Sequence, residues 1–151
     1  MAQGNVRWGI IGTAEIAKKV VAGMHDAANA EVVGIASRSL DRAEAWASEH
    51  GVPRAFGSYE DMLADDHIDA VYLPVPTAFR NEWIEKAARA GKHVYAEKPL
   101  ADGIEDAIAV CKEHGVQFMD GTMWVHSCHR VMSSLFRSAE TDGSVVSISR
   151  Y

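Results

Sequence analysis

The regular alternation of strand-like and helix-like segments is the feature of this sequence that most constrains its fold. Short apolar runs alternate with segments in which apolar residues recur every three or four positions. Successive strands joined by helices pair in parallel through right-handed crossovers, which leaves helices on both faces of the sheet. We therefore predict an α/β fold with a doubly wound parallel sheet. Strands are expected near residues 6–11, 31–36, 54–56, 69–73, 93–96 and 116–119, and helices near 16–24, 40–47, 58–61, 77–90 and 104–114.

Capping residues mark the ends of several of these helices. Ser39, Ser58 and Thr77 stand directly before helical patterns, where a hydroxyl can accept a hydrogen bond from a free backbone N–H group. Gly51 closes the second helix, because glycine suits the left-handed backbone that ends many helices. The helix that starts near Thr77 is expected to bury one apolar face. That face is made of Phe79, Trp83, Ile84, Ala87 and Ala88.

Size and charge narrow the range of partners. A length of 151 residues suits one domain, and 48% hydrophobic with 24% charged residues is typical of globular proteins. The net charge of −6 argues against nucleic-acid binding. No apolar stretch approaches the ~20 residues of a membrane-spanning helix. Two cysteines, Cys111 and Cys128, are too few for a disulfide framework. We expect a cytoplasmic protein that binds neither nucleic acid nor membranes.

A turn follows the first expected strand, where a dinucleotide pyrophosphate would meet the free N–H groups and the positive end of a helix. It reads Gly-x-Ala-x-x-Ala, with alanine at the second and third glycine positions of the usual fingerprint. Alanine adds only a methyl group, which hinders a phosphate without blocking it. The alternative is an ordinary strand-to-helix turn. The residues predicted to bind cofactor here are Gly12, Thr13, Ala14 and Ile16.

The second expected strand ends in Ser37 and Arg38, where NAD-specific proteins usually carry an acid that holds the ribose hydroxyls. A hydroxyl and a guanidinium suit the 2′-phosphate of NADP, because arginine offers a planar fork of donors and a fixed charge. The alternative is that Arg38 is a solvated loop residue and Ser39 only caps a helix. The sequence predicts NADP as the cofactor, in preference to NAD.

A charged tripeptide ends the fifth expected strand, at the edge of the sheet where ligands bind in such folds. In chain order, the motifs are Gly12, Ser37-Arg38, Pro76-Thr77 and Glu97-Lys98-Pro99. Together they resemble the Gfo/Idh/MocA oxidoreductases over about residues 5–125. Residues 115–126 resemble the branch of that family that contains dihydrodiol dehydrogenase and NADP-dependent xylose dehydrogenases.

The resemblance implies a Rossmann domain that serves hydride transfer between NADP and a sugar, polyol or dihydrodiol. It implies that Lys98 is catalytic, beside the nicotinamide and the substrate, and that Pro99 follows a cis peptide. An ammonium group at this place can hydrogen-bond the hydroxyl being oxidised and stabilise alkoxide charge. The alternative is a surface Glu-Lys pair before a proline. The cofactor-binding residues at the later strand ends are Pro74, Pro76, Thr77, Glu97 and Lys98.

Two features depart from the relatives. Many of them carry a histidine three residues after the opening of the fourth helix, where this chain has Arg80, so no role of that histidine is carried over. They also carry a second domain that supplies a catalytic histidine. We therefore expect these 151 residues to bind the cofactor and to turn substrate over slowly or not at all. A non-catalytic NAD(P)-binding regulatory module is the alternative function.

The last part of the chain does not continue the alternation. We predict a dinucleotide-binding domain over residues 1–125, and over 126–151 a linker helix and the first strand of a second α+β domain. The final strand has no later partner, so it packs on the domain, pairs with a second copy as a homo-oligomer, or opens a further domain. Residues 126–129 read His-Ser-Cys-His, but no fourth ligand stands at a supporting distance. No metal site is predicted.

Overall fold

The structure is a computed structural model that describes residues 5–121. Within this range the predicted alternation is confirmed. The elements are β1 (Val6–Ile11), α1 (Glu15–Asp26), β2 (Ala30–Ala36), α2 (Leu40–His50), β3 (Ala55–Phe56), α3 (Tyr59–Leu63), β4 (Ala70–Leu73), α4 (Thr77–Arg89), β5 (His93–Glu97), α5 (Ile104–Glu113) and β6 (Phe118–Gly121). The linker helix, final strand and His-Ser-Cys-His segment predicted within residues 126–151 lie outside the described residues.

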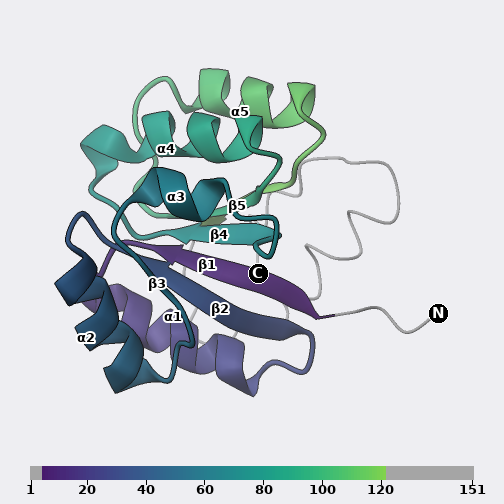
Figure 1. Ribbon diagram of the computed structural model, residues 1–151. Helices are drawn as coiled ribbons and strands as arrows, with labels where there is room; N and C mark the ends of the chain where they lie inside the picture. Colours follow the sequence, from purple (N-terminus) through teal and green to yellow (C-terminus); the bar gives the residue numbers. More distant parts are fainter. Residues whose placement is uncertain (1–4, 122–151) are drawn as a thin grey trace.

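The strands form one parallel sheet in the order β3-β2-β1-β4-β5-β6. The chain runs outward from β1 to β3, then returns to the other side of β1 and runs outward again to β6. The strand order therefore reverses between β1 and β4, and in doubly wound sheets ligands bind beside this reversal, outside the carboxyl ends of the strands. Figure 1 shows the sheet at the centre of the molecule between two layers of helices.

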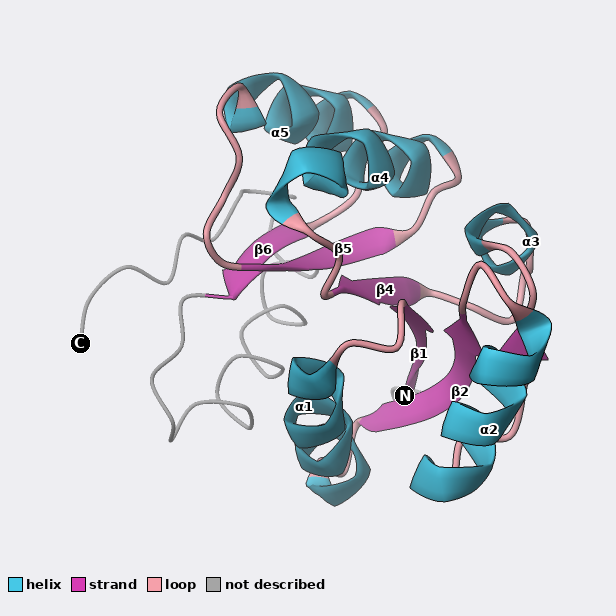
Figure 2. Cartoon of the chain, turned by 90° about the vertical axis from the view of Figure 1, so that its left-hand side faces the viewer, coloured by secondary structure: helices cyan, strands magenta, loops and turns pink. Residues whose placement is uncertain are grey.

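Helices cover both faces of the sheet and give the domain two apolar cores. The helices α3, α4 and α5 pack on one face, and α1 and α2 pack on the other, as Figure 2 shows edge-on. The central strands are buried on both sides, because a parallel sheet has no face turned to water. Among the helices of the described range, none is long and apolar enough to span a bilayer.

Two glycines in the central strands allow α3 to approach the sheet. Gly9 of β1 and Gly34 of β2 are paired across the sheet. A methyl group added at Gly9 would lie 2.7 Å from the Met62 sulfur, and one added at Gly34 would lie 2.8 Å from the Phe56 ring. Both distances are too short for carbon contacts, so these positions leave no room for a side chain.

The capping predictions for α2 and α3 are confirmed. The Ser39 hydroxyl accepts from the backbone N–H of Arg42, and the Ser58 hydroxyl accepts from that of Asp61. Gly51 ends α2 in the left-handed conformation with φ of 67°. The helices α2 and α3 therefore begin where a serine hydroxyl accepts from a free backbone N–H group, and α2 ends at a glycine.

The predictions for the start of α4 are wrong in two respects. Thr77 is the first residue of the helix rather than its cap, and Pro76 occupies the cap position. Phe79 is 54% exposed, while Arg80 is buried. The reason is helical phase: Arg80 lies four positions before the buried Ile84, whereas Phe79 lies five before it and is turned away from the core.

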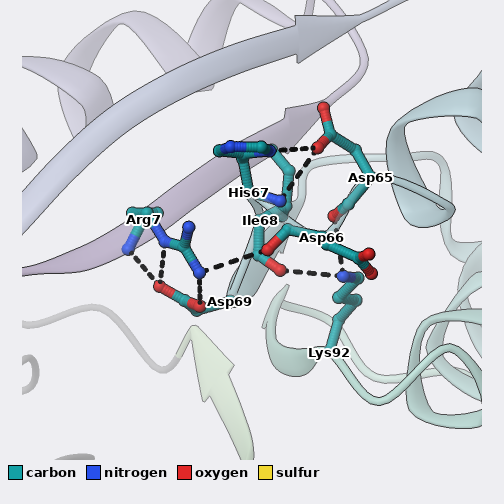
Figure 3. Close-up of polar contacts among 7 residues, drawn as sticks. All are labelled: Arg7, Asp65, Asp66, His67, Ile68, Asp69 and Lys92. Carbon is teal, nitrogen blue, oxygen red and sulfur yellow. Dashed lines mark hydrogen bonds and ion pairs between the residues drawn. The ribbon is translucent and has the colours of Figure 1, made fainter.

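A polar network closes the amino edge of the sheet (Figure 3). Arg7 donates from its backbone N–H, Nε and Nη2 to the Asp69 carboxylate over 2.6–2.9 Å. The Lys92 ammonium donates to the carbonyl oxygens of Asp65 and Ile68, each at 2.8 Å. The hydrogen bonds from Arg7 lower the pKa of Asp69. These contacts satisfy the polar groups of the loop before β4 and leave the opposite edge of the sheet for function.

Stability should fall as the pH drops from 7 to 5, because the folded chain holds the partly buried His93 in its neutral form. Burial lowers the pKa of His93, against the opposing charge of Asp69, and its Nδ1 accepts from the backbone N–H of Gln117 at 3.1 Å. Below pH ~6.5 the unfolded chain takes up a proton that the folded chain binds less readily, so the loss approaches at most about 1.4 kcal/mol per pH unit.

The measurement is urea unfolding at pH 7, 6 and 5. His93→Asn keeps an acceptor and should flatten the dependence over this range, whereas the control His114→Asn, at an exposed site, should leave it unchanged. An equal pH dependence in wild type and His93→Asn would contradict the role of His93.

Candidate dinucleotide site

The turn after β1 forms a cradle at the start of α1. Gly12 has φ of +106°, a conformation that side-chain-bearing residues rarely adopt, and its N–H donates to the Ala36 carbonyl at 2.9 Å. Ala14 occupies the cap position of α1, and no side chain caps this helix. The N-terminal N–H groups therefore have no side-chain acceptor. The Glu15 carboxylate, the nearby negative charge, pairs with the Lys18 ammonium at 3.0 Å. This arrangement suits an anion.

The end of β2 presents one buried and one exposed side chain. Ser37 is 5% exposed, and its hydroxyl accepts from the backbone N–H of Ser39 at 3.4 Å. Arg38 is exposed and takes part in none of the ion pairs found among residues 5–121. Its guanidinium therefore remains available to a ligand, while Ser37 shapes the backbone beside it.

A pocket of about 500 Å³ opens next to Arg38. Its apolar wall consists of Tyr59, Phe79 and Trp83, with the rings of Tyr59 and Trp83 meeting edge to face at 4.8 Å. The Lys86 ammonium lies 4.1 Å from the centre of the Trp83 ring, on which it packs. The exposure of Phe79 has a physical reason here, since the ring lines a cavity instead of the core. An open pocket with aromatic walls and the Arg38 guanidinium in its lining suits a nucleotide base.

This aromatic wall was not predicted from the sequence. Phe79 and Trp83 are four positions apart on α4 and so lie on the same side of the helix, which was a detectable signal. Tyr59 could not be added, because it comes from α3 and meets Trp83 only in the folded chain. The Tyr59 hydroxyl also lies near the turn of residues 12–14, the phosphate turn. It is 3.6 Å from the position that a Cβ on Gly12 would occupy.

The end of β5 places Lys98 at the same edge. Glu97 is 4% exposed, and its carboxylate accepts from the Tyr72 hydroxyl at 2.6 Å and from the backbone N–H of Lys98 at 3.2 Å. Burial and the Glu97 carboxylate raise the pKa of Tyr72, so its phenol remains a donor. The Lys98–Pro99 peptide is cis, as predicted. Lys98 is exposed, with its backbone held by Glu97.

The residues predicted for the site all lie at the carboxyl edge of the sheet. Ile16 and Thr77 belong to the first turns of α1 and α4, Glu97 ends β5, and the others lie on the loops that follow four of the strands. These are the loops after β1, β2, β4 and β5, with Pro74 buried, Thr77 half-buried and Pro76 exposed. Among the described residues, no group of three His, Cys, Asp or Glu side chains is arranged to hold a metal ion. The edge therefore offers a cradle for phosphate, a pocket for a base and one exposed lysine.

Comparisons with known proteins agree with this geometry. Residues 6–122 match the family model described as the oxidoreductase family with the NAD-binding Rossmann fold. An uncharacterised oxidoreductase from Rhizobium meliloti is 54% identical over 102 residues, which cover 67% of this chain and 30% of that protein. A D-xylose 1-dehydrogenase (NADP(+)) from Haloferax volcanii is 44% identical over 120 residues, 78% of this chain and 37% of its own.

Solved structures show the same fold. The 3-ketoreductase KijD10 from Actinomadura kijaniata, determined in complex with NADP, superposes with a TM-score of 0.77 at 36% identity. The match covers 89% of this chain and 44% of that chain. The present chain thus spans less than half the length of these relatives. Matching family residues, fold and strand-end motifs place the chain in the Gfo/Idh/MocA oxidoreductase family, with the family's NAD-binding Rossmann fold.

Proposed function

We propose that this chain binds NADP along the carboxyl edge of its sheet and serves hydride transfer between the nicotinamide and a CH–OH carbon of a sugar or polyol. The observation that carries the proposal is the placement of an uncapped helix start, the Arg38 pocket and Lys98 on one edge. The residues fit the cofactor: the α1 start suits its pyrophosphate, and the aromatic pocket suits its adenine. NADP-dependent sugar enzymes among the relatives support the assignment.

The preference for NADP over NAD rests on the end of β2. Arg38 stands there without a carboxylate neighbour in the motif, so a 2′-phosphate would meet an unpaired guanidinium. Glu60 and Glu82 line the same pocket, but the Lys86 ammonium pairs with both carboxylates. NAD lacks that phosphate and would leave the guanidinium without its strongest ligand. Arg38 is therefore assigned to the 2′-phosphate, with Ser37 as the hydroxyl donor beside it.

Lys98 is assigned the chemical role at the opposite end of the site. Bound NADP supplies the hydride acceptor or donor. The Lys98 ammonium would donate a hydrogen bond to the substrate oxygen and stabilise negative charge on it as the C–H bond breaks. Glu97 fixes the Lys98 backbone, and Tyr72 in turn fixes Glu97, so the lysine starts from a rigid base. We place the protein in the cytoplasm, where reducing conditions keep the buried Cys111 a thiol.

Replacing Arg38 should weaken NADP binding and leave NAD binding nearly unchanged. Arg38→Ala removes a charge-assisted contact that contributes on the order of 1.5–3 kcal/mol. Calorimetric titration with both cofactors measures the difference. Arg42→Ala serves as the matched control, because Arg42 is an exposed arginine one turn away on α2. Equal affinities of the wild-type chain for NADP and NAD would refute the assignment.

A carboxylate in the phosphate turn should abolish binding of both cofactors while the fold survives. Ala14→Asp places negative charge and bulk at the start of α1, where the pyrophosphate is expected, yet aspartate is a favourable helix cap. Ala14→Gly, which restores a glycine of the usual fingerprint, should keep the affinity. Thermal unfolding confirms that each variant is folded. Unchanged affinity in Ala14→Asp would mean that the cofactor binds elsewhere.

Lys98→Met should remove whatever NADPH formation the chain supports with a panel of aldoses and polyols when the variant is assayed at saturating NADP. Loss of a polarising or proton-transferring group typically lowers rates by about 10²–10⁴-fold. Slow turnover that depends on Lys98 would support the proposed chemistry. Tight NADP binding without any turnover would favour a non-catalytic NADP-binding module, and turnover that does not depend on Lys98 would contradict the role assigned to it.

A further inference from the structure

Arg80 is a buried arginine that joins two loops of the proposed site. It comes from the first turn of α4 and is 4% exposed. Its Nη2 donates to the carbonyl of Val75 at 2.6 Å, in the loop after β4. Its Nη1 donates to the carbonyl of Pro99, in the loop after β5, and to the Thr77 hydroxyl at 3.4 Å. One side chain thus bonds the loop before α4 to the residue that follows Lys98.

A second contact holds the same loop farther along. Asn81, the next residue on α4, donates from its side-chain amide to the carbonyl of Asp102 at 2.8 Å. The first turns of α4 therefore fix the loop that carries Lys98 at both Pro99 and Asp102. Among the described residues, the side-chain hydrogen bonds from α4 to that loop come from Arg80 and Asn81.

Burying the charged Arg80 side chain costs free energy that a residue with only a packing role would not require. Burial lowers the pKa of Arg80, opposed by the Glu97 charge nearby, and arginine stays charged in proteins. Its Nε is buried and has no hydrogen-bond partner. A buried charge that is bonded mainly to carbonyl oxygens contributes little net stability, and an apolar residue on this helix face would often serve the fold as well. The distinctive property of the guanidinium is that it reaches both loops at once.

We propose that Arg80 is a positioning residue that couples the loop of residues 74–77 to the loop of residues 98–102, so that cofactor bound at the first loop sets the place of Lys98 at the second. This inference rests on the proposed function, because it takes residues 74–77 as cofactor contacts and Lys98 as the residue beside the substrate. Arg80 itself touches neither ligand. It acts through the Val75 and Pro99 carbonyls.

The test measures how NADP protects Lys98 from an acetylating reagent, sulfo-NHS acetate, with labelling followed by mass spectrometry. Exposed Lys112 on α5 is the internal reference. At a free NADP concentration of about ten times Kd, a fully covered Lys98 in the wild-type chain should react about tenfold more slowly. Protection without a change at Lys112 shows that the effect is local.

Two variants break the link in different ways. Arg80→Met keeps the length and loses the donors, and Arg80→Lys keeps a charge but cannot span two carbonyls as a planar fork does. At the same fractional saturation, NADP should slow the acetylation of Lys98 about twofold or less in both variants. The reason is that a lysine only partly covered by bound NADP continues to react. Arg89→Met, on the exposed end of the same helix, should behave like the wild type.

The outcomes separate this inference from the proposed function. Wild-type chain that binds no NADP would refute the proposed function itself. Wild-type chain that binds NADP, with full Lys98 protection retained in folded Arg80→Met and Arg80→Lys, would overturn the coupling alone. Amide hydrogen exchange of the wild-type chain gives a reading that does not depend on the variants folding. NADP should slow exchange over residues 100–103, and slowing confined to the phosphate turn and residues 77–79 would also overturn the coupling.

Discussion

Burial of the parallel sheet on both faces is the constraint on which the rest of this structure depends. Strands β1 and β4 lie between two helix layers, so their side chains are apolar or absent, apart from Arg7 at the amino end of β1 and the Tyr72 phenol, which donates to Glu97. At Gly9 and Gly34 the space that a methyl group would take is filled by the side chains of Met62 in α3 and Phe56 in β3, respectively. A sheet filled in this way has no room between its strands and the helix layers for unpaired polar groups or a bound ligand. Polar function is therefore restricted to the two edges where the strands begin and end.

The polar groups at the two edges of the sheet differ in whether they have partners within the protein. At the amino edge, Arg7 and Asp69 pair with each other, and Lys92 satisfies two loop carbonyls, so the polar groups there are already used within the protein. At the carboxyl edge, Arg38 lacks an ion-pair partner within the described range, and α1 lacks a side-chain cap. The two edges therefore differ in which polar groups already have partners within the protein, and this difference supports the proposal that a ligand binds at the carboxyl edge.

Sequence reasoning predicted the fold well because local signals and long-range packing agree. Ser39 and Ser58 cap their helices through contacts three residues away, which sequence spacing reveals directly. The errors came where a long-range contact decides. Phe79 is apolar yet exposed, because its ring lines a pocket shared with α3, and Arg80 is charged yet buried, because Val75 and Pro99 supply acceptors. Neither acceptor is a side chain, so no residue pattern announces it.

The pattern of helix caps links stability to ligand binding. Serine hydroxyls cap α2 and α3, and each such cap stabilises a helix by ~1 kcal/mol. No side chain caps the starts of α1, α4 or α5, and of these helices α1 is the one that follows the central strand at the turn that carries Gly12. A pyrophosphate at Gly12 would accept from the N–H groups that serine serves elsewhere and would meet the positive end of the helix dipole. Under the proposed function, the ligand completes the start of α1, and the domain gives up some stability of its own to make cofactor binding stronger.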